Sequence, residues 1–426
     1  MLRLFLLLTL CMLRLGAEEG ENENLMELYF PTGTRWWGTM MLSYKAEKSG
    51  NYNFFDKRNN AFSGTLVLGS EQWLTKGLGV GWELAGWSDL GLDIAEAPRV
   101  SESITSSYLA GLRSLSGTEV SQAYLSWTWG ESLWRVGRMA LSKRLSPWLW
   151  SDRSAGVLDL SYEGLTVSSW SPGGMLWYGG WIDRAINGGD ATFIGRHLEG
   201  SSFLKRGVVF LTGLRSEEGS EWSLSAYYLG SSFHILPTDE GTYKGDGFQE
   251  WSLWGIWTRT KLPVLQGVQL VYVDGRAPGY RRTFAGALRF EKEWDSHRFR
   301  LTLAAHNGGD YSLKSAGIGV GSGAFWGSSI SGEFGSDSVG SRMWLGRLDY
   351  FYDLEQGDRW YAGVAVADFD GKGRYRYRQA FGARLGRRFE TGPFFGKLEY
   401  RFRHMEYQGG TTALRQRLRA DLGYRF

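Results

Sequence analysis

The sequence predicts an all-β protein, a transmembrane antiparallel β-barrel of about 18 strands. Apolar and polar side chains alternate with a period of two over segments of about ten residues, as in strands with two unlike faces. The composition suits extended sheet, because the 426 residues include 60 glycines and 15% aromatic residues but only 8 prolines. After the N-terminal stretch no run of about 18 apolar residues occurs, so a membrane-spanning helix is not predicted.

The N-terminal stretch MLRLFLLLTLCMLRLGAEEG predicts a secretory signal peptide. Arg3 gives a positive start, residues 4–13 form a short apolar run, and Ala17 offers a small residue for cleavage. A lipoprotein signal ending at Cys11 is the weaker alternative, because Leu10 is not small. The expected organisation is a signal peptide at 1–17, a periplasmic N-terminal segment at 18–34 and a single barrel at 35–426. Removing the signal peptide removes the single cysteine, so no disulfide is expected.

The chain ends in ALRQRLRADLGYRF, residues 413–426, which shows the alternation clearly. A helix would spread its arginines and leucines around the whole circumference, whereas a strand separates them onto two faces. The apolar face carries Leu414, Leu418, Leu422, Tyr424 and Phe426. The same period recurs in residues 121–129, 282–292, 297–306 and 393–404. We expect the apolar faces to contact lipid and Phe426 to mark the periplasmic end.

A soluble β-sandwich would also alternate, but its strands average about five to six residues. Strands that cross a membrane need about nine to eleven, which fits the segments in this sequence better. Aromatic residues crowd the predicted strand ends, as they do in the interfacial girdles of membrane barrels. Open sheet edges are not tolerated in lipid, because each unpaired backbone group costs several kcal/mol. The sheet is therefore expected to close.

The predicted strands follow the alternation from the first to the last. They cover residues 35–45, 60–69, 76–87, 121–129, 133–139, 156–162, 164–183, 206–214, 220–230, 248–259, 265–274, 282–292, 297–306, 341–352, 358–368, 377–389, 393–404 and 413–426. The segment 164–183 is the weakest, because Ser171-Pro172-Gly173-Gly174 interrupts it, and 16 strands are the alternative count.

The connections between these strands fall into two classes of length. Short links at 293–296, 354–357 and 390–393 are predicted on the periplasmic side, together with Phe426. The long connections are predicted outside, at 88–120, 140–155, 184–205, 231–247, 307–340 and 369–376. Short turns on one side and long loops on the other are typical of outer-membrane barrels. The Gly- and Ser-rich segment 307–340 is expected to be a surface loop.

The charge pattern argues against nucleic-acid binding and in favour of a basic lumen. Net charge is only +3, yet the 48 basic residues are mostly arginine, which recognises carboxylates and phosphates through paired hydrogen bonds. By strand parity ten arginines face the lumen, and we call them the arginine ladder. They are Arg289, Arg298, Arg300, Arg347, Arg384, Arg401, Arg403, Arg415, Arg417 and Arg419. The alternative is that they pair with Glu291, Asp349, Glu399 and Asp421 and only satisfy a polar interior.

Enzymatic chemistry and cofactors are not expected. The five histidines, His197, His234, His297, His306 and His404, show no metal-ligand spacing, and no nucleophile with a neighbouring base stands out. The glycine-rich run at 317–323 lacks the lysine and helix of a phosphate loop.

One region resembles a known family. In residues 119–159 the stretch Gln122-Ala123-Tyr124-Leu125 is followed by Gly137-Arg138 and then by Ser151-Asp152-Arg153. These motifs, in this order and spacing, resemble those of OprD-like outer-membrane porins, whose characteristic positions would here be Tyr124, Gly137 and Arg138. The sequence departs from the pattern at Met139 and in the aromatic run Trp148-Leu149-Trp150. The terminal Phe426 is similar to the assembly signal of outer-membrane barrels.

The resemblance implies an 18-stranded channel of the bacterial outer membrane, trimeric in some cases, that takes up small solutes bearing a carboxylate. Inward-folded loops narrow such channels. We expect the loop at 140–155 to do so here, with Lys143, Arg144, Asp152 and Arg153 as its selectivity groups. Trp148 would dock the loop on the wall or, alternatively, stack on a solute. Further expected partners are outer-membrane lipids and lipopolysaccharide, the barrel-assembly machinery and a second and third copy of the chain. A surface adhesin or structural barrel, and a lipid hydrolase, are the alternative functions.

Overall fold

The computed structural model describes most of the barrel and part of its connections. The described residues are 34–49, 60–75, 77–88, 116–149, 151, 161–171, 173–187, 190–193, 207–217, 219–237, 243–259, 265–276, 279–311, 313, 325–326, 340–354, 357–370 and 377–426. The predicted signal peptide at 1–17 and nearly all of the predicted periplasmic segment lie outside these residues. No helix in the described ranges is both long and apolar enough to cross a membrane.

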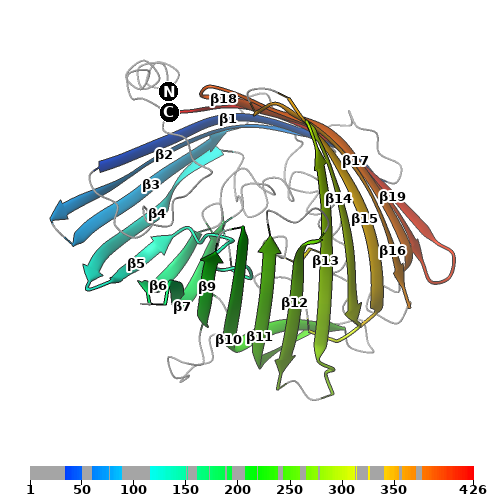
Figure 1. Ribbon diagram of the computed structural model, residues 1–426, viewed down its shortest axis with the longest axis horizontal. Coiled ribbons are helices and arrows are strands. Elements are labelled where there is room, and N and C mark those ends of the chain that lie inside the picture. Colours follow the sequence, from blue (N-terminus) through cyan, green and yellow to red (C-terminus); the bar gives the residue numbers. More distant parts are fainter. Residues whose placement is uncertain are drawn as a thin grey trace.

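The described residues form a single antiparallel sheet that closes on itself (Figure 1). Its strands are β1 (Thr34–Ser49), β2 (Asn60–Thr75), β3 (Leu78–Ser88), β4 (Ser116–Trp129), β5 (Ser132–Met139), β6 (Ser161–Trp170), β7 (Met175–Asn187), β8 (Asp190–Phe193), β9 (Val208–Glu217), β10 (Ser220–Pro237), β11 (Tyr243–Arg259), β12 (Leu265–Gly275), β13 (Thr283–Trp294), β14 (His297–Asn307), β15 (Arg342–Asp353), β16 (Arg359–Phe369), β17 (Tyr377–Thr391), β18 (Phe394–Tyr407) and β19 (Thr412–Arg425).

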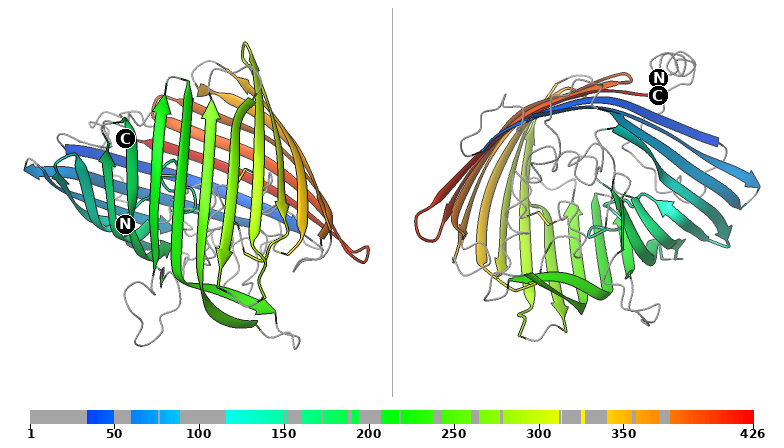
Figure 2. Two further views of the ribbon diagram at one scale, coloured as in Figure 1. Left: turned by 60° about the horizontal axis from the view of Figure 1, so that its bottom comes forward. Right: turned by 180° about the vertical axis from the view of Figure 1, so that it is seen from behind.

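Eighteen of these strands form the wall of the barrel. The short β8 pairs only with residues 184–187 of β7, on the side where residues 175–182 of β7 pair with β9, so β8 is in line with β9 and adds no separate strand to the ring. The strands lie side by side and tilted in the wall (Figure 2). The structure therefore confirms the predicted closed antiparallel barrel of 18 strands and excludes the count of 16.

The barrel closes where the last strand meets the first. β19 pairs with β1 in a register that runs from Thr39 opposite Arg425 to Ser49 opposite Arg415. Beyond the strand, the backbone N–H of Gly38 donates to the Phe426 carbonyl at 2.8 Å, and the Phe426 N–H donates to the Gly38 carbonyl at 3.1 Å. The Phe426 ring lies directly over Gly38, where a Cβ would be only 2.0 Å from it. The terminal aromatic residue is thus part of the seam.

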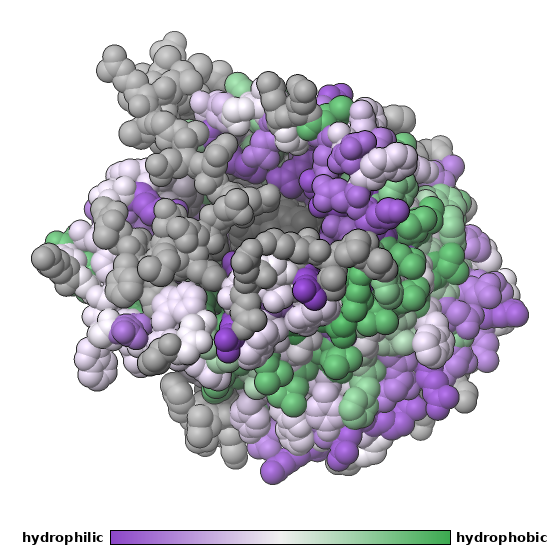
Figure 3. Space-filling view, in the orientation of Figure 1, coloured by the Kyte–Doolittle hydropathy of each residue, from purple (hydrophilic) through white to green (hydrophobic). Residues whose placement is uncertain are grey.

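The outer face of the wall is apolar. Along β19, exposed Leu414 and Leu422 alternate with the half-buried or buried arginines, and comparable alternation recurs in the other strands. Large apolar side chains exposed on the outside include Trp36, Leu84, Leu125, Leu211, Leu253, Leu270, Leu301, Trp344, Val366, Leu385 and Leu398. Figure 3 shows a hydrophobic band across the outer surface with hydrophilic residues on both sides of it. Such a band suits contact with the hydrocarbon of a bilayer.

Two predicted strands need correction. The segments 156–162 and 164–183 are in fact β6 and β7, which a turn after Trp170 separates. In this turn the Ser171 N–H donates to the Met175 carbonyl at 2.9 Å, and Gly174 has φ of 72°. Ser171, Gly173 and Gly174, which looked like an interruption, therefore belong to the turn of a hairpin, and Pro172 lies outside the described residues. The alternation continues on both sides of it, which is why the two strands looked like one.

The remaining differences concern the ends of strands. β1 begins at Thr34, one residue earlier than predicted. β10 and β11 are longer than the predicted 220–230 and 248–259 and include residues 231–237 and 243–247 of the expected loop, whose remainder lies outside the described residues. The short turns at 130–131, 295–296 and 392–393 lie at the end of the barrel where Phe426 is found, whereas the short turn at 408–411 between β18 and β19 lies at the opposite end. This asymmetry matches the predicted orientation.

Gly137 in β5 supports a fold prediction. Its φ is +127°, and a Cβ there would lie 2.3 Å from the backbone oxygen of Ala123 in β4. Gly137→Ala should therefore destabilise the barrel by roughly 1–3 kcal/mol from backbone strain, with the clash added to that. Urea unfolding in detergent, followed by the heat-sensitive shift of the folded barrel on gels, measures the change. Gly255→Ala is the control, since nothing lies within 4 Å of its added Cβ. Equal stability of both variants would contradict the prediction.

Candidate functional site

The inner wall of the barrel has two chemically different halves. Across β6–β12 it carries large apolar and aromatic side chains, which form one buried cluster that includes Tyr162, Tyr178, Phe210, Tyr227 and Trp254. Across β13–β19 and on into β1 and β2 it carries arginines and carboxylates as well, although the apolar cluster continues there through Met343, Phe369 and Met405. Charged groups therefore gather on one side of the lumen, where solutes could meet them.

The structure places every arginine of the ladder on this charged half. Each one occupies an inward position in its strand, as the alternation with exposed apolar residues shows. Arg289 lies on β13, Arg298 and Arg300 on β14, Arg347 on β15, Arg384 on β17, Arg401 and Arg403 on β18, and Arg415, Arg417 and Arg419 on β19.

Carboxylates lie among these arginines. Glu47 of β1 accepts hydrogen bonds from Arg417 at 3.0 and 3.1 Å and also from Arg415. Asp349 of β15 accepts from Arg384 at 2.8 Å and from Arg347 at 3.1 Å. Each of these carboxylates thus bridges two guanidinium groups.

The pair between Asp349 and Arg384 spans an intervening strand. β16 lies between β15 and β17, and its residue at this height is Gly363. A Cβ on Gly363 would be 2.4 Å from the Asp349 oxygen and 3.2 Å from the Arg384 Nε. The absence of a side chain therefore lets the ion pair cross over the strand.

Two further carboxylates repeat the arrangement. Glu399 accepts from Arg401 at 2.6 Å and from the Tyr361 hydroxyl at 3.0 Å, and the Lys397 ammonium lies 3.3 Å away. Glu291 lies 2.6 Å from Arg300 and 3.9 Å from Arg298.

A fifth carboxylate, Asp421, accepts from Arg419 at 2.6 Å and from the Ser43 hydroxyl at 2.7 Å. A sixth, Asp353 of β15, lies 3.4 Å from Arg298. In the described part of the chain the ten ladder arginines therefore face six carboxylates on the same wall, so positive charge remains in excess. Both interpretations of the sequence describe part of this arrangement. Four of the six carboxylates are those that the sequence suggested, and Glu47 and Asp353 are the two that it did not.

A cavity of about 550 Å³ opens along the charged wall. Its polar lining includes Arg384, Arg388, Arg401, Arg419 and Arg425, and its apolar lining includes Phe351, Tyr361 and Phe395. Guanidinium groups beside aromatic rings suit a small anion with a flat apolar body.

The predicted constriction loop folds into the barrel. In its described part, 140–149 and 151, Trp148 is fully buried and meets the Tyr227 ring edge-on at 5.1 Å. The Tyr227 hydroxyl also accepts the Trp148 N–H at 3.2 Å and lies 3.3 Å from the Ser146 hydroxyl. Trp148 therefore docks the segment on the wall.

The predicted selectivity groups of this loop have different surroundings. Arg144 is exposed and donates from Nε to Glu221 of β10 at 2.8 Å. Lys143 is also exposed. Asp152, Arg153 and Trp150 lie outside the described residues.

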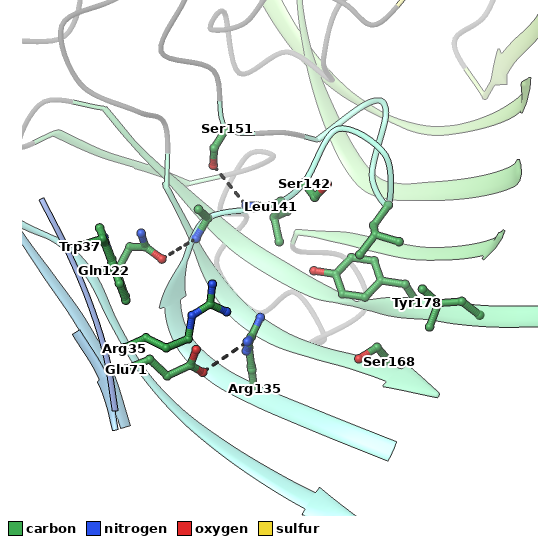
Figure 4. A pocket seen from close by; sticks show the side chains of 13 residues that line it. Arg35, Trp37, Glu71, Gln122, Arg135, Leu141, Ser142, Ser151, Ser168 and Tyr178 are labelled. Carbon is green, nitrogen blue, oxygen red and sulfur yellow. Dashed lines mark hydrogen bonds and ion pairs between the residues drawn. The ribbon is translucent and has the colours of Figure 1, made fainter. Parts of the chain in front are cut away.

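Between this segment and the wall lies a second cavity, of about 410 Å³ (Figure 4). Its charged groups are Arg35, Arg135 and Glu71, and the last two form an ion pair at 3.3 Å. Leu141, Leu176 and Tyr178 provide an apolar side. Neither arginine was among the sequence candidates, although the alternation in β5 would have pointed Arg135 inward. The cavity could accept a small molecule that combines an anionic group with an apolar body.

Described parts of 307–340 also fold inward, where the sequence led us to expect a surface loop. The described residues Tyr311, Leu313, Phe325 and Trp326 are buried. The Trp326 N–H donates to the Gln269 side chain at 2.7 Å, and the Arg289 guanidinium lies 4.1 Å from the centre of the Trp326 ring. The glycine content suggested a solvated loop, but its aromatic residues supply apolar surface to bury.

The three motif residues have structural contacts. The Tyr124 ring lies over Gly81, where a Cβ would be 2.1 Å from it, and the Arg135 guanidinium lies 5.3 Å from its centre. Arg138 points to the outer side by strand alternation and donates to Glu163 at 2.8 Å.

No cluster of three or more potential metal ligands occurs in the part of the chain that the structure describes.

Comparison with known proteins identifies the fold. No protein-family model matches the sequence, and no curated protein matches it. Solved structures match over nearly the whole chain. OccAB4 of Acinetobacter baumannii is 13% identical, with a TM-score of 0.67, over 93% of this chain and 99% of that one. OccK8 (OprE) of Pseudomonas aeruginosa is 12% identical, with a TM-score of 0.66, over 93% and 99%. The chain has the OprD-like porin fold.

A third match is the outer membrane protein OpdK of Pseudomonas aeruginosa, 14% identical with a TM-score of 0.62 over 92% of this chain and 98% of that one. The OprD-like fold extends the resemblance first seen in residues 119–159 to the whole barrel. Identities of 12–14% establish the architecture and leave the solute open.

Proposed function

We propose that the protein is a channel of the bacterial outer membrane that passively conducts small anionic or zwitterionic solutes, above all those bearing a carboxylate. The observation that carries the proposal is the excess of guanidinium groups over carboxylates on one inner wall of a closed barrel with an apolar outer face. Arginine binds carboxylates through two parallel hydrogen bonds, which makes it suited to this solute class. OprD-like structural neighbours support a channel rather than an enzyme.

A neighbouring structure supports the proposed solute class. OpdK of Pseudomonas aeruginosa, 14% identical to this chain, was crystallised with vanillate, an aromatic carboxylate. In this protein, the cavity that combines Arg384 and Arg401 with Phe351 and Tyr361 has suitable groups for the charged and the aromatic parts of such a molecule. A solute would descend by exchanging one guanidinium partner for the next.

The inward segment at 140–151 is the proposed constriction. Docked through Trp148, it narrows the apolar side of the lumen, and Lys143, Arg144, Asp152 and Arg153 would act as its selectivity groups. Lipopolysaccharide, the barrel-assembly machinery and two further copies of the chain are the proposed partners outside the lumen. The removal of residues 1–17 as a signal peptide is likewise part of the proposal.

Two measurements on the purified, refolded protein test this function. Planar-bilayer recordings in a salt gradient should show single-channel steps with a reversal potential on the anion-selective side, as the arginine excess requires. Swelling of proteoliposomes should be faster in small carboxylates than in neutral sugars of similar size. A barrel that is silent in both assays would contradict the proposal. Binding to a surface ligand without conductance would favour an adhesin, and release of fatty acids from phospholipid would favour a hydrolase.

A further inference from the structure

Four carboxylates on the charged wall repeat one arrangement, in which a single acid lies between two cations. The groups are Glu47 with Arg415 and Arg417, Asp349 with Arg347 and Arg384, Glu399 with Lys397 and Arg401, and Glu291 with Arg298 and Arg300. We call these groups the shared-carboxylate triads. The three charged groups of each triad sum to one net positive charge, and in the Glu291 triad Arg298 also pairs with Asp353 at 3.4 Å. Glu47 meets its arginines across the closure of the barrel and Asp349 reaches Arg384 over β16, whereas the Glu399 triad lies on β18 alone and the Glu291 triad on the hairpin of β13 and β14.

The acid and the cations of a triad differ in exposure. The carboxylate side chains of Glu47, Asp349 and Glu399 are only 4%, 1% and 3% exposed. Their cationic partners are 16–28% exposed. In these three triads the acid therefore lies behind its cations, against the wall, and the cations form the surface that an entering anion meets. In the fourth, Glu291 is 14% exposed, and Arg298 and Arg300 are 19% and 23% exposed.

This geometry leaves donors for a second anion. A guanidinium carries five N–H groups in a fixed fork, and a bridging carboxylate uses at most two of them. Arg417 can thus keep Glu47, and Arg401 can keep Glu399, while each still donates towards the lumen. A carboxylate that enters the lumen and the carboxylate of the wall then compete for the same guanidinium group.

We propose that the triad carboxylates are specificity-determining residues that set how long a conducted anion stays. Without the wall carboxylate, two unneutralised cations would converge on the solute and hold it. With the wall carboxylate present, each triad carries a single net positive charge. As the solute leaves, this carboxylate accepts the hydrogen bonds of the guanidinium groups again. Conduction requires binding that is strong enough to enter and weak enough to leave. This inference rests on the proposed anion channel, and it names the residues that keep that channel from trapping its solute.

The alternative is that these carboxylates only neutralise the positive charge of the wall and have no effect on conduction. In that case, replacing one by its amide would change stability or leave conduction as it was. The two accounts differ in one observable, the residence time of an anion, and in its direction. Glu47→Gln and Glu399→Gln keep the size of the side chain and an acceptor oxygen while removing the charge. The two residues belong to separate triads, so each variant is an independent test.

The experiment is single-channel recording in planar bilayers with benzoate as the probe at neutral pH. Both variants should lengthen the current interruptions that benzoate causes, on the order of tenfold for the loss of one nearby negative charge, and should increase anion over cation permeability. Glu131→Gln is the matched control, because it removes the same charge from an exposed turn between β4 and β5. Its interruptions should keep the length found in the unaltered protein.

Each outcome separates this inference from the channel proposal. An unaltered protein without conductance or without anion preference contradicts the proposed function itself. An unaltered protein that conducts anions, with folded variants that release benzoate as fast as it does, overturns only the role of the triads. If Glu47→Gln and Glu399→Gln both fail to give the heat-shifted folded form on gels, their carboxylates are structural, and the inference is wrong.

Discussion

Replacing Arg403, Arg415 and Arg417 together by alanine is expected to abolish the anion preference of the channel and to turn it towards cations. The three side chains lie on the adjacent strands β18 and β19, and Arg403 is directly opposite Arg415 in the register. Their removal leaves Glu47 without the two guanidinium groups that it bridges. The local charge of these four residues then falls from +2 to −1. Reversal potentials in a salt gradient measure the change, and the ratio of anion to cation permeability should fall by roughly tenfold or more.

The matched control removes the same amount of charge elsewhere. Arg282, Arg378 and Arg387 lie near strand ends, with side chains 65%, 66% and 45% exposed. Their triple alanine variant should keep the selectivity of the unaltered protein, because exposed ion pairs outside the lumen are strongly screened. If the triple variant of Arg403, Arg415 and Arg417 stays anion-selective, the arginine ladder does not determine the selectivity of the channel. An equal change of anion selectivity in both triple variants would lead to the same conclusion.

The position of the ladder was predictable because strand parity is a local property. In a strand of known phase, every second residue points the same way, so Arg415, Arg417 and Arg419 had to face away from Leu414 and Leu418. The apolar faces fixed that phase, since the opposite phase would place arginines in hydrocarbon at a cost of about 2–4 kcal/mol each near the midplane. This rule alone predicts that the ten arginines of the ladder point inward.

The partners of those arginines were less predictable, because pairing depends on which strands become neighbours. Glu47 meets Arg415 only through closure of the barrel between its first and last strands, across 368 positions of sequence. Asp349 reaches Arg384 only because Gly363 leaves space above the strand between them. The alternation of apolar and polar residues along the strands gives no indication of either contact. Register and close approach decided which acid bridges which pair.

The inward segments were also beyond periodic reasoning. Residues 140–151 and the described parts of 307–340 form no strand of the barrel, and each is held by a few aromatic contacts. Trp148 and Trp326 are buried, and their backbone N–H groups bond to side chains of the wall. The resemblance to OprD-like porins pointed to the first segment, whereas nothing in the sequence pointed to the second. In turn 171–174, by contrast, the proline and glycines gave a local signal, and only the continuing alternation hid it.

Trp148→Ala is expected to release the segment at 140–151 from the wall and to widen the channel. The indole is fully buried, and it packs on Tyr227, whose hydroxyl holds the Trp148 backbone and Ser146. Truncating a buried tryptophan costs about 3–5 kcal/mol. The exposed ion pair of Arg144 with Glu221 remains, but such a pair contributes only about 0–1 kcal/mol and cannot hold the segment by itself.

The pairing of the eighteen barrel strands does not depend on this contact. We therefore expect the segment at 140–151 to detach locally while the barrel stays folded. Single-channel conductance should rise, and liposomes should swell in solutes too large for the unaltered protein. Tyr227→Phe should show a smaller effect in the same direction, since it keeps the ring and removes only the hydroxyl that bonds to the segment. Trp129→Ala is the control, because this tryptophan is 76% exposed at the end of β4. If Trp148→Ala folds and conducts like the control, the segment does not narrow the lumen, and the constriction must be formed by other parts of the chain.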